Sequence, residues 1–138
     1  MTHEDLVPIG LRTYGALQLA QGAWMVVDPG SFFDVIGPFG ARNDHYTRDA
    51  ATWSIALGVV LCLVAARGTR GARAAVLLLA ALQAGLHTVN HIADAGIADP
   101  GWVGVFDAVS LGAITLALLA LWRLATTSPT SATAEASP

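Results

Sequence analysis

Four long stretches of this chain carry almost no charge, and they limit its fold more than any other feature. They cover residues 7–27, 50–66, 74–93 and 102–122. A helix that crosses a bilayer needs about 20 mostly apolar residues, and each stretch comes close to that length. The second stretch reaches it if the helix begins near Thr47. The sequence therefore predicts an all-α integral membrane protein, a bundle of four transmembrane helices.

The composition supports this class of protein. Hydrophobic residues make up 54% of the 138 residues and charged residues 12%, whereas a soluble domain carries about 25% charged residues. Four helices with short connections occupy residues 1–125, which leaves no room for a soluble domain. The remaining segment, 126–138, consists mainly of Ser, Thr, Ala and Pro. It has too little apolar surface to fold, so we expect a disordered cytoplasmic tail.

Charge and cysteine content exclude several other classes. The net charge is −3, Lys is absent, and the seven Arg form no patch suited to nucleic acid. Cys62 is the one cysteine, so an internal disulfide is excluded. The acidic start, with Glu4 and Asp5, is unlike the basic start of a signal peptide. We therefore expect the first apolar stretch to be retained as a helix.

The orientation follows from the distribution of arginine. The loop 67–73 contains Arg67, Arg70 and Arg73, and Arg123 closes the last stretch on the same side. Short loops rich in Arg stay in the cytoplasm. With four spans, both termini are then cytoplasmic as well. The Ala- and Arg-rich, Lys-free composition is typical of a bacterium, so the predicted location is the plasma membrane, with lipid as the surrounding partner.

The first outer loop, 31–47, is long and partly apolar. Its apolar residues are Phe32, Phe33, Val35, Ile36 and Phe39. They predict a short segment that lies on the membrane surface or folds into the bundle. Asn43, Asp44 or Thr47 is expected to cap the second spanning helix.

Small residues indicate where helices touch. Ala81 and Gly85 form one small-xxx-small pair, and Ala108 and Gly112 form another. Such pairs allow close approach of helix backbones in lipid. We therefore expect a compact bundle.

Polar residues on the third stretch share one helix face. Gln83, His87, Asn90, His91 and Asp94 are separated by steps that place them on one stripe. Ionised groups cost about 2.5 kcal/mol or more near the centre of a bilayer, so the stripe is expected to face the bundle interior. Arg48 is expected to pair with Asp94 or Asp107, and Asp49 with a His of the stripe. The predicted pocket, open to the outer side, contains these residues: His45, Arg48, Asp49, His87, Asn90, His91, Asp94 and Asp107.

Three interpretations of this cluster remain open. In the first, buried ion pairs and hydrogen bonds only fix the helix register. In the second, His87 and His91 at i and i+4 chelate a metal ion, and Asp49 or Asp107 completes the ligand set. In the third, the pocket binds a quinone head group or a lipid and handles protons through His. A non-catalytic subunit that holds another membrane protein, or a second copy of the chain, is the alternative to all ligand-binding functions.

A family resemblance agrees with the predicted fold. The segment 37–49, followed by Ala56-Leu57-Gly58, resembles the loop and second helix of small bacterial DoxX-like membrane proteins, and His87, Asn90 and His91 fit the same pattern. The resemblance covers roughly residues 6–124. It implies a four-helix bundle and membrane redox chemistry linked to quinones. The chain lacks the cysteine pair that redox chemistry of its own side chains would need.

Overall fold

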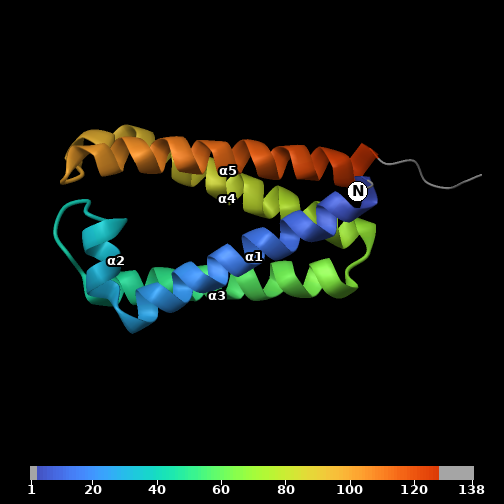
Figure 1. Ribbon diagram of the computed structural model, residues 1–138, viewed down its shortest axis with the longest axis horizontal. Helices are drawn as coiled ribbons and strands as arrows, with labels where there is room; N and C mark the ends of the chain where they lie inside the picture. Colours follow the sequence, from blue (N-terminus) through green and yellow to red (C-terminus); the bar gives the residue numbers. More distant parts are fainter. Residues whose placement is uncertain (1–2, 128–138) are drawn as a thin grey trace, which may run out of the picture.

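The computed structural model describes residues 3–127 and shows an all-helical chain (Figure 1). Its α-helices are α1 (His3–Val27), α2 (Pro29–Val35), α3 (Asp44–Arg67), α4 (Arg70–Asp94) and α5 (Gly101–Thr127), and a short 3-10 helix, η1 (Ala95–Ile97), follows α4. The all-α class is thereby confirmed. The predicted disordered tail falls almost wholly on residues 128–138, outside the described residues.

Three of these helices have the length and apolar composition to cross a membrane. They are α3, the continuous stretch Arg70–Ile97 that comprises α4 and η1, and α5. The 25-residue helix α1 does not belong to this set. It carries Arg12, Gln18 and Gln21 along its length, which lower its mean hydropathy. Three of the four predicted spans are thus supported by composition.

The long helices form two antiparallel pairs, α1 with α3 and α4 with α5 (Figure 1). The start of α1, the α3–α4 loop and the end of α5 lie together, and we call this the arginine end. The opposite end, with α2 and the α4–α5 turn, is the α2 end. A shared apolar core joins the two pairs and includes the fully buried Leu11, Leu61 and Leu77.

Glycines set the close contact between α1 and α3. A Cβ added at Gly58 would lie 2.8 Å from the carbonyl oxygen of Gly15, and one added at Gly22 would lie 3.2 Å from that of Ala51. Each of these contacts involves backbone, which cannot move aside as a side chain can. The two helices can therefore approach this closely only with glycine at these positions.

The contact between α4 and α5 includes Gly85 and Gly112, two of the small residues predicted to lie at helix contacts. A Cβ at Gly85 would meet Thr115 at 3.5 Å, and one at Gly112 would meet Thr88 at 3.7 Å. The hydroxyl oxygens of Thr88 and Thr115 lie 3.2 Å apart across the interface. The prediction that Gly85 and Gly112 lie at helix contacts is confirmed.

Arginines in the first turn of α4 cap the ends of neighbouring helices. Arg70 donates to the carbonyl of Ala125 at 2.7 Å, near the end of α5. Arg73 donates to the carbonyl of Ala65 at 3.2 Å, near the end of α3. The last carbonyls of a helix lack partners and carry its negative dipole end, so a guanidinium is stabilising there. Arg70 and Arg73 therefore join the start of α4 to the ends of α5 and α3.

The predicted short segment of the first outer loop is the helix α2. Asp28 is its N-cap and accepts from the backbone N–H of Ser31 at 3.0 Å. Pro29 follows at the start of the helix, where a missing N–H costs nothing. Phe32 is buried against Met25 and Ala51, so α2 folds onto α1 and α3. Asn43 caps α3, one of the three predicted alternatives.

The two connections at the α2 end are tied together. Phe39 and Ala98 form an isolated antiparallel bridge. The N–H of Asp99 donates to the carbonyl of Pro38 at 3.2 Å. Gly40 follows with φ of +72°, a conformation that glycine adopts without strain. The loop that carries Phe39 is thereby held over the space between the two helix pairs.

Candidate functional site: a polar cavity between the helix pairs

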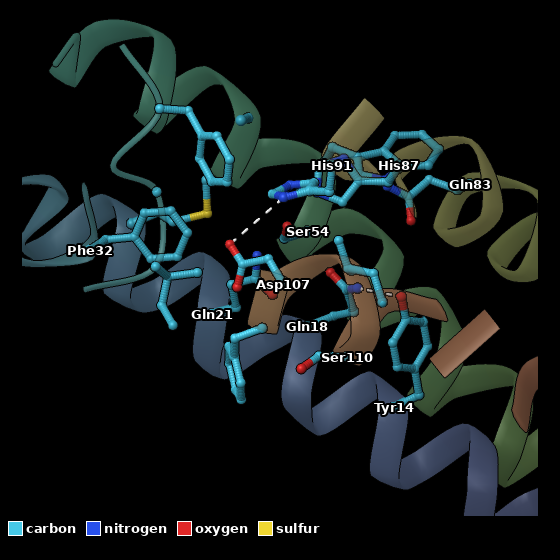
Figure 2. A pocket seen from close by; sticks show the side chains of 18 residues that line it. Tyr14, Gln18, Gln21, Phe32, Ser54, Gln83, His87, His91, Asp107 and Ser110 are labelled. Carbon is cyan, nitrogen blue, oxygen red and sulfur yellow. Dashed lines mark hydrogen bonds and ion pairs between the residues drawn. The ribbon is translucent and has the colours of Figure 1, made fainter. Parts of the chain in front are cut away.

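A cavity of about 380 Å³ lies between the α1–α3 pair and the α4–α5 pair (Figure 2). All four long helices line it, and α2 with the loop after it closes the α2 end. The shared apolar core fills the arginine end of the bundle, so the cavity begins where the core stops. Its size falls within the range of about 300–1,000 Å³ that small-molecule sites occupy.

The central polar feature is the pair His91 and Asp107. The Nδ1 atom of His91 on α4 lies 3.7 Å from the Oδ2 atom of Asp107 on α5. Their side chains are 17% and 7% exposed. Both atoms are buried, and neither has a hydrogen-bond partner among residues 3–127. The dashed line in Figure 2 joins these two atoms. Since 3.7 Å is too long for a hydrogen bond, the pair does not satisfy either atom.

Aromatic rings hold His91 in place. The ring of His87, one turn earlier on α4, meets it edge to face with centroids 4.6 Å apart. Phe39 contacts it from the loop after α2 in the same manner at 4.8 Å. Because Phe39 is fixed by the bridge to Ala98, the loop positions a histidine of the distant helix α4.

Neutral hydrogen-bonding groups line the side of the cavity nearest the core. Gln18 donates to the hydroxyl of Tyr14 at 2.7 Å. Ser54 of α3 is 7% exposed, and Gln83 and Ser110 complete this part of the lining. Amides and hydroxyls can both donate and accept, so this side can orient a polar group of either kind.

Apolar and aromatic side chains form the remaining walls. Met25 comes from α1, and Phe32 and Ile36 come from α2 and its C-cap. Trp53 and Phe106 come from α3 and α5. A cavity with apolar walls and a few converging polar groups is the usual form of a small-molecule site. The arrangement therefore suits a ligand with an apolar body and one polar group.

The structure separates the predicted site residues into two groups. His87, His91 and Asp107 line the cavity. The other five lie at the α2 end in exposed positions: His45, Arg48, Asp49, Asn90 and Asp94.

The expected ion pairs differ from those observed. His45 and Asp49, one turn apart on α3, face each other at 3.4 Å with side chains 87% and 65% exposed. Asp49 therefore pairs within its own helix and not with a histidine of α4. Arg48 forms no ion pair with Asp94 or Asp107. Because α3 begins as early as Asp44, its first turns present these residues to the outside.

The three-ligand metal set is not assembled. Among the side chains that the structure describes, no three of the His, Cys, Asp and Glu groups converge as metal ligands would. His87 and His91 are adjacent, but Asp49 lies apart from them beside His45.

Several lining residues were missed by sequence reasoning. The largest omission is on α1, where Tyr14, Gln18 and Gln21 face the cavity. These three residues are spaced by four and three positions, which places them on one helix face, as on α4. Their shared face could therefore have been predicted from the sequence. Ser54, Ser110 and Phe39 carry no such signal, because each is a single residue in an apolar or loop context.

Comparison with known proteins gives no assignment: no family model, no curated protein and no solved structure matches the chain.

Proposed function

We propose that this chain is a bacterial plasma-membrane protein with four transmembrane helices that binds a small, partly apolar ligand in the cavity between its helix pairs. One observation carries the ligand-binding proposal. The cavity contains two buried polar atoms, Asp107 Oδ2 and His91 Nδ1, for which the described part of the chain supplies no hydrogen-bond partner. Buried polar groups without partners are rare in folded proteins and call for an explanation, which a bound ligand would supply.

The proposal makes α1 the fourth spanning helix. Its 25 residues match the length of α3, along which it packs in antiparallel orientation (Figure 1). Its polar residues Tyr14 and Gln18 turn toward the cavity, so they need not face lipid. A polar stripe on a spanning helix is tolerated when it lines an interior cavity.

The orientation is part of the same proposal. Both termini and the arginine end would be cytoplasmic, following the positive-inside rule. The cavity, at the α2 end, would then lie near the outer leaflet. The DoxX-like resemblance stays part of the proposal, and Gly37 and Phe39 of the resembling segment line the cavity. A quinone or another organic molecule is favoured over a metal ion, for which the described residues bring no third ligand together.

The test is to identify what copurifies with the protein. A detergent-purified sample is examined by native mass spectrometry, solvent extraction and elemental analysis. We expect one organic molecule per chain. Ser54→Leu should displace it, because Ser54 is buried in the cavity wall. Thr52→Leu is the matched control, since Thr52 is exposed two residues away on the same helix.

Two results would contradict the proposal. One is equal ligand content in the two variants, which would place the molecule elsewhere. The other is a sample that contains no ligand and instead a stoichiometric membrane-protein partner, which would support the subunit or scaffold function.

A further inference from the structure

The charge balance of the cavity indicates the chemical class of its ligand. Asp107 is the one acidic side chain among the described residues that line it, and no arginine lines it. Arg42 pairs with Asp44, and Arg70 and Arg73 cap helix ends. A carboxylate this deeply buried is stable only beside a positive or donating partner. Among the described residues, His91 is the one such partner near Asp107, at a distance too long for a hydrogen bond.

The unsatisfied atoms indicate what the partner must offer. Asp107 Oδ2 is an acceptor, and His91 Nδ1 is an acceptor when the imidazole proton is on Nε2. A single group with two or more N–H donors can serve both atoms, since they lie 3.7 Å apart. A primary ammonium has three such donors and a positive charge. A quaternary ammonium has the charge but no donor.

The walls suit the same ligand. Phe32, Phe39, Trp53 and Phe106 line the cavity that contains the polar pair, and Phe39 contacts His91 directly. Aromatic faces attract cations, and the attraction grows when water is excluded. The aromatic walls can also hold the apolar part of the molecule.

We propose that the ligand is a lipophilic primary amine, bound as its ammonium ion to Asp107 and His91. This inference rests on the proposed function, because it assigns a chemical class to the ligand of the same cavity. A neutral hydroxyl compound such as a quinol could also donate to Asp107, but it would leave the negative charge of the cavity uncompensated. An ammonium ligand should therefore bind more tightly than a neutral hydroxyl compound of the same size, because only the ammonium carries a positive charge.

The experiment uses probes of similar size that differ in charge and in donor count. They are 2-phenylethylamine, its N-trimethyl derivative and neutral 2-phenylethanol. Binding to the full-length protein in detergent at pH 7 is measured by calorimetry, after any copurified molecule has been removed. We expect the primary ammonium to bind at least about tenfold more tightly than the alcohol, with the quaternary ion between them. The same titrations with Ser54→Leu protein measure the heat of probe partition into detergent. This heat is subtracted from the wild-type signal.

Variants connect the preference to the carboxylate. Asp107→Asn should abolish the preference for the ammonium, and Asp107→Glu should retain part of it. Asp94→Asn is the control, since it removes an exposed carboxylate from the same end of the molecule. Because the comparison of probes is made on the wild-type protein, it remains decisive even if a variant fails to fold.

The outcomes separate the two proposals. If the alcohol binds as tightly as the ammonium, or a quinone binds more tightly than both, the ammonium assignment is overturned and the binding function stands. If no probe binds and the purified protein never contained a ligand, the proposed function itself fails. An ammonium preference that Asp107→Asn leaves unchanged would place the cation at another site and overturn the assignment.

Discussion

At the scale of single residues, Asp107 is the group whose proposed role in binding would come at a cost in stability. Its Oδ2 atom is buried 3.7 Å from His91 Nδ1 and has no hydrogen-bond partner among the residues that the structure describes. An unsatisfied buried group costs about 1–3 kcal/mol, more when it is charged. Proteins commonly retain such costs where a ligand will bind.

We therefore expect Asp107→Asn to raise the free energy of unfolding of the ligand-free protein by about 1–2 kcal/mol. The amide removes the charge while keeping the shape, and little attraction to His91 is lost at this distance. Thermal unfolding in detergent measures the change. Asp49→Asn is the control, because its exposed pair with His45 contributes little. A less stable Asp107→Asn protein would show that the carboxylate has a structural role.

Asp28 provides a second residue-scale prediction, at the start of α2. The backbone N–H of Ser31 donates to its carboxylate, which lowers the pKa of Asp28 from its ordinary value of about 3.8, and the hydroxyl of Ser31 and the charge of Arg42 act in the same direction. A carboxyl whose pKa is lower in the folded state stabilises that state above the ordinary pKa. The stabilisation is lost as the pH falls through the lowered value.

We expect the amides of Ser31 and Phe32 to lose protection against hydrogen exchange as the pH falls below about 3.8. Asp28→Asn should cap α2 independently of pH, because the amide oxygen also accepts the bond. Hydrogen exchange read by mass spectrometry on the segment around α2 measures this. Protection that is identical in wild type and Asp28→Asn across the acid range would exclude the carboxylate as the cause.

At the scale of elements, the four long helices pack as two close pairs and not as one evenly packed bundle. The α1–α3 pair depends on glycines whose missing side chains allow backbone contact. The α4–α5 pair uses Gly85, Gly112 and the facing threonines Thr88 and Thr115. Each pair is closely packed, and the cavity lies between the pairs.

Gly58→Ala should destabilise the protein by about 1–3 kcal/mol, because overpacking forces the helices apart. Its new Cβ would lie 2.8 Å from the carbonyl oxygen of Gly15. Gly71→Ala is the matched control, since a Cβ there meets nothing within 4 Å. It should stabilise the protein by up to about 1 kcal/mol through helix propensity alone. Equal effects in the two variants, measured by thermal unfolding, would mean that the α1–α3 contact is looser than described.

At the scale of the whole molecule, the two ends of the bundle differ in chemistry. Arginines cap helices at one end, and the cavity with its tied loops lies at the other. The proposed topology places these ends on opposite sides of the membrane. Cys62, the one native cysteine, is easily replaced, so single cysteines can report on each end.

In a Cys62→Ala background, a membrane-impermeant maleimide should label Ala41→Cys in intact cells. Gly71→Cys should react only after permeabilisation. Both positions are exposed, at the α2 end and the arginine end respectively. Thr2→Cys, before the described residues, reports on α1. It should behave like Gly71→Cys if α1 spans the membrane, and labelling in intact cells would contradict the fourth span.

The amino-acid sequence by itself determined the class of fold and one wall of the site. Charge-poor stretches of about 20 residues can satisfy their backbone in lipid only as helices, so the all-α class follows from composition. The spacing of His87 and His91 likewise placed them on one face of α4, because a helix turns through 3.6 residues. Both properties are local, and local properties can be predicted from the chain alone.

The tertiary structure decided which groups meet. Asp107, not Asp49, lies beside His91, and the amides of α1 line the same cavity. Partner choice depends on how each helix is rotated about its axis and which neighbour it packs against. A shift of one residue turns a side chain by about 100°, so small changes in packing move a carboxylate from the interior to the surface. Glycine contacts between backbones set those rotations, and they become visible only when the helices are assembled.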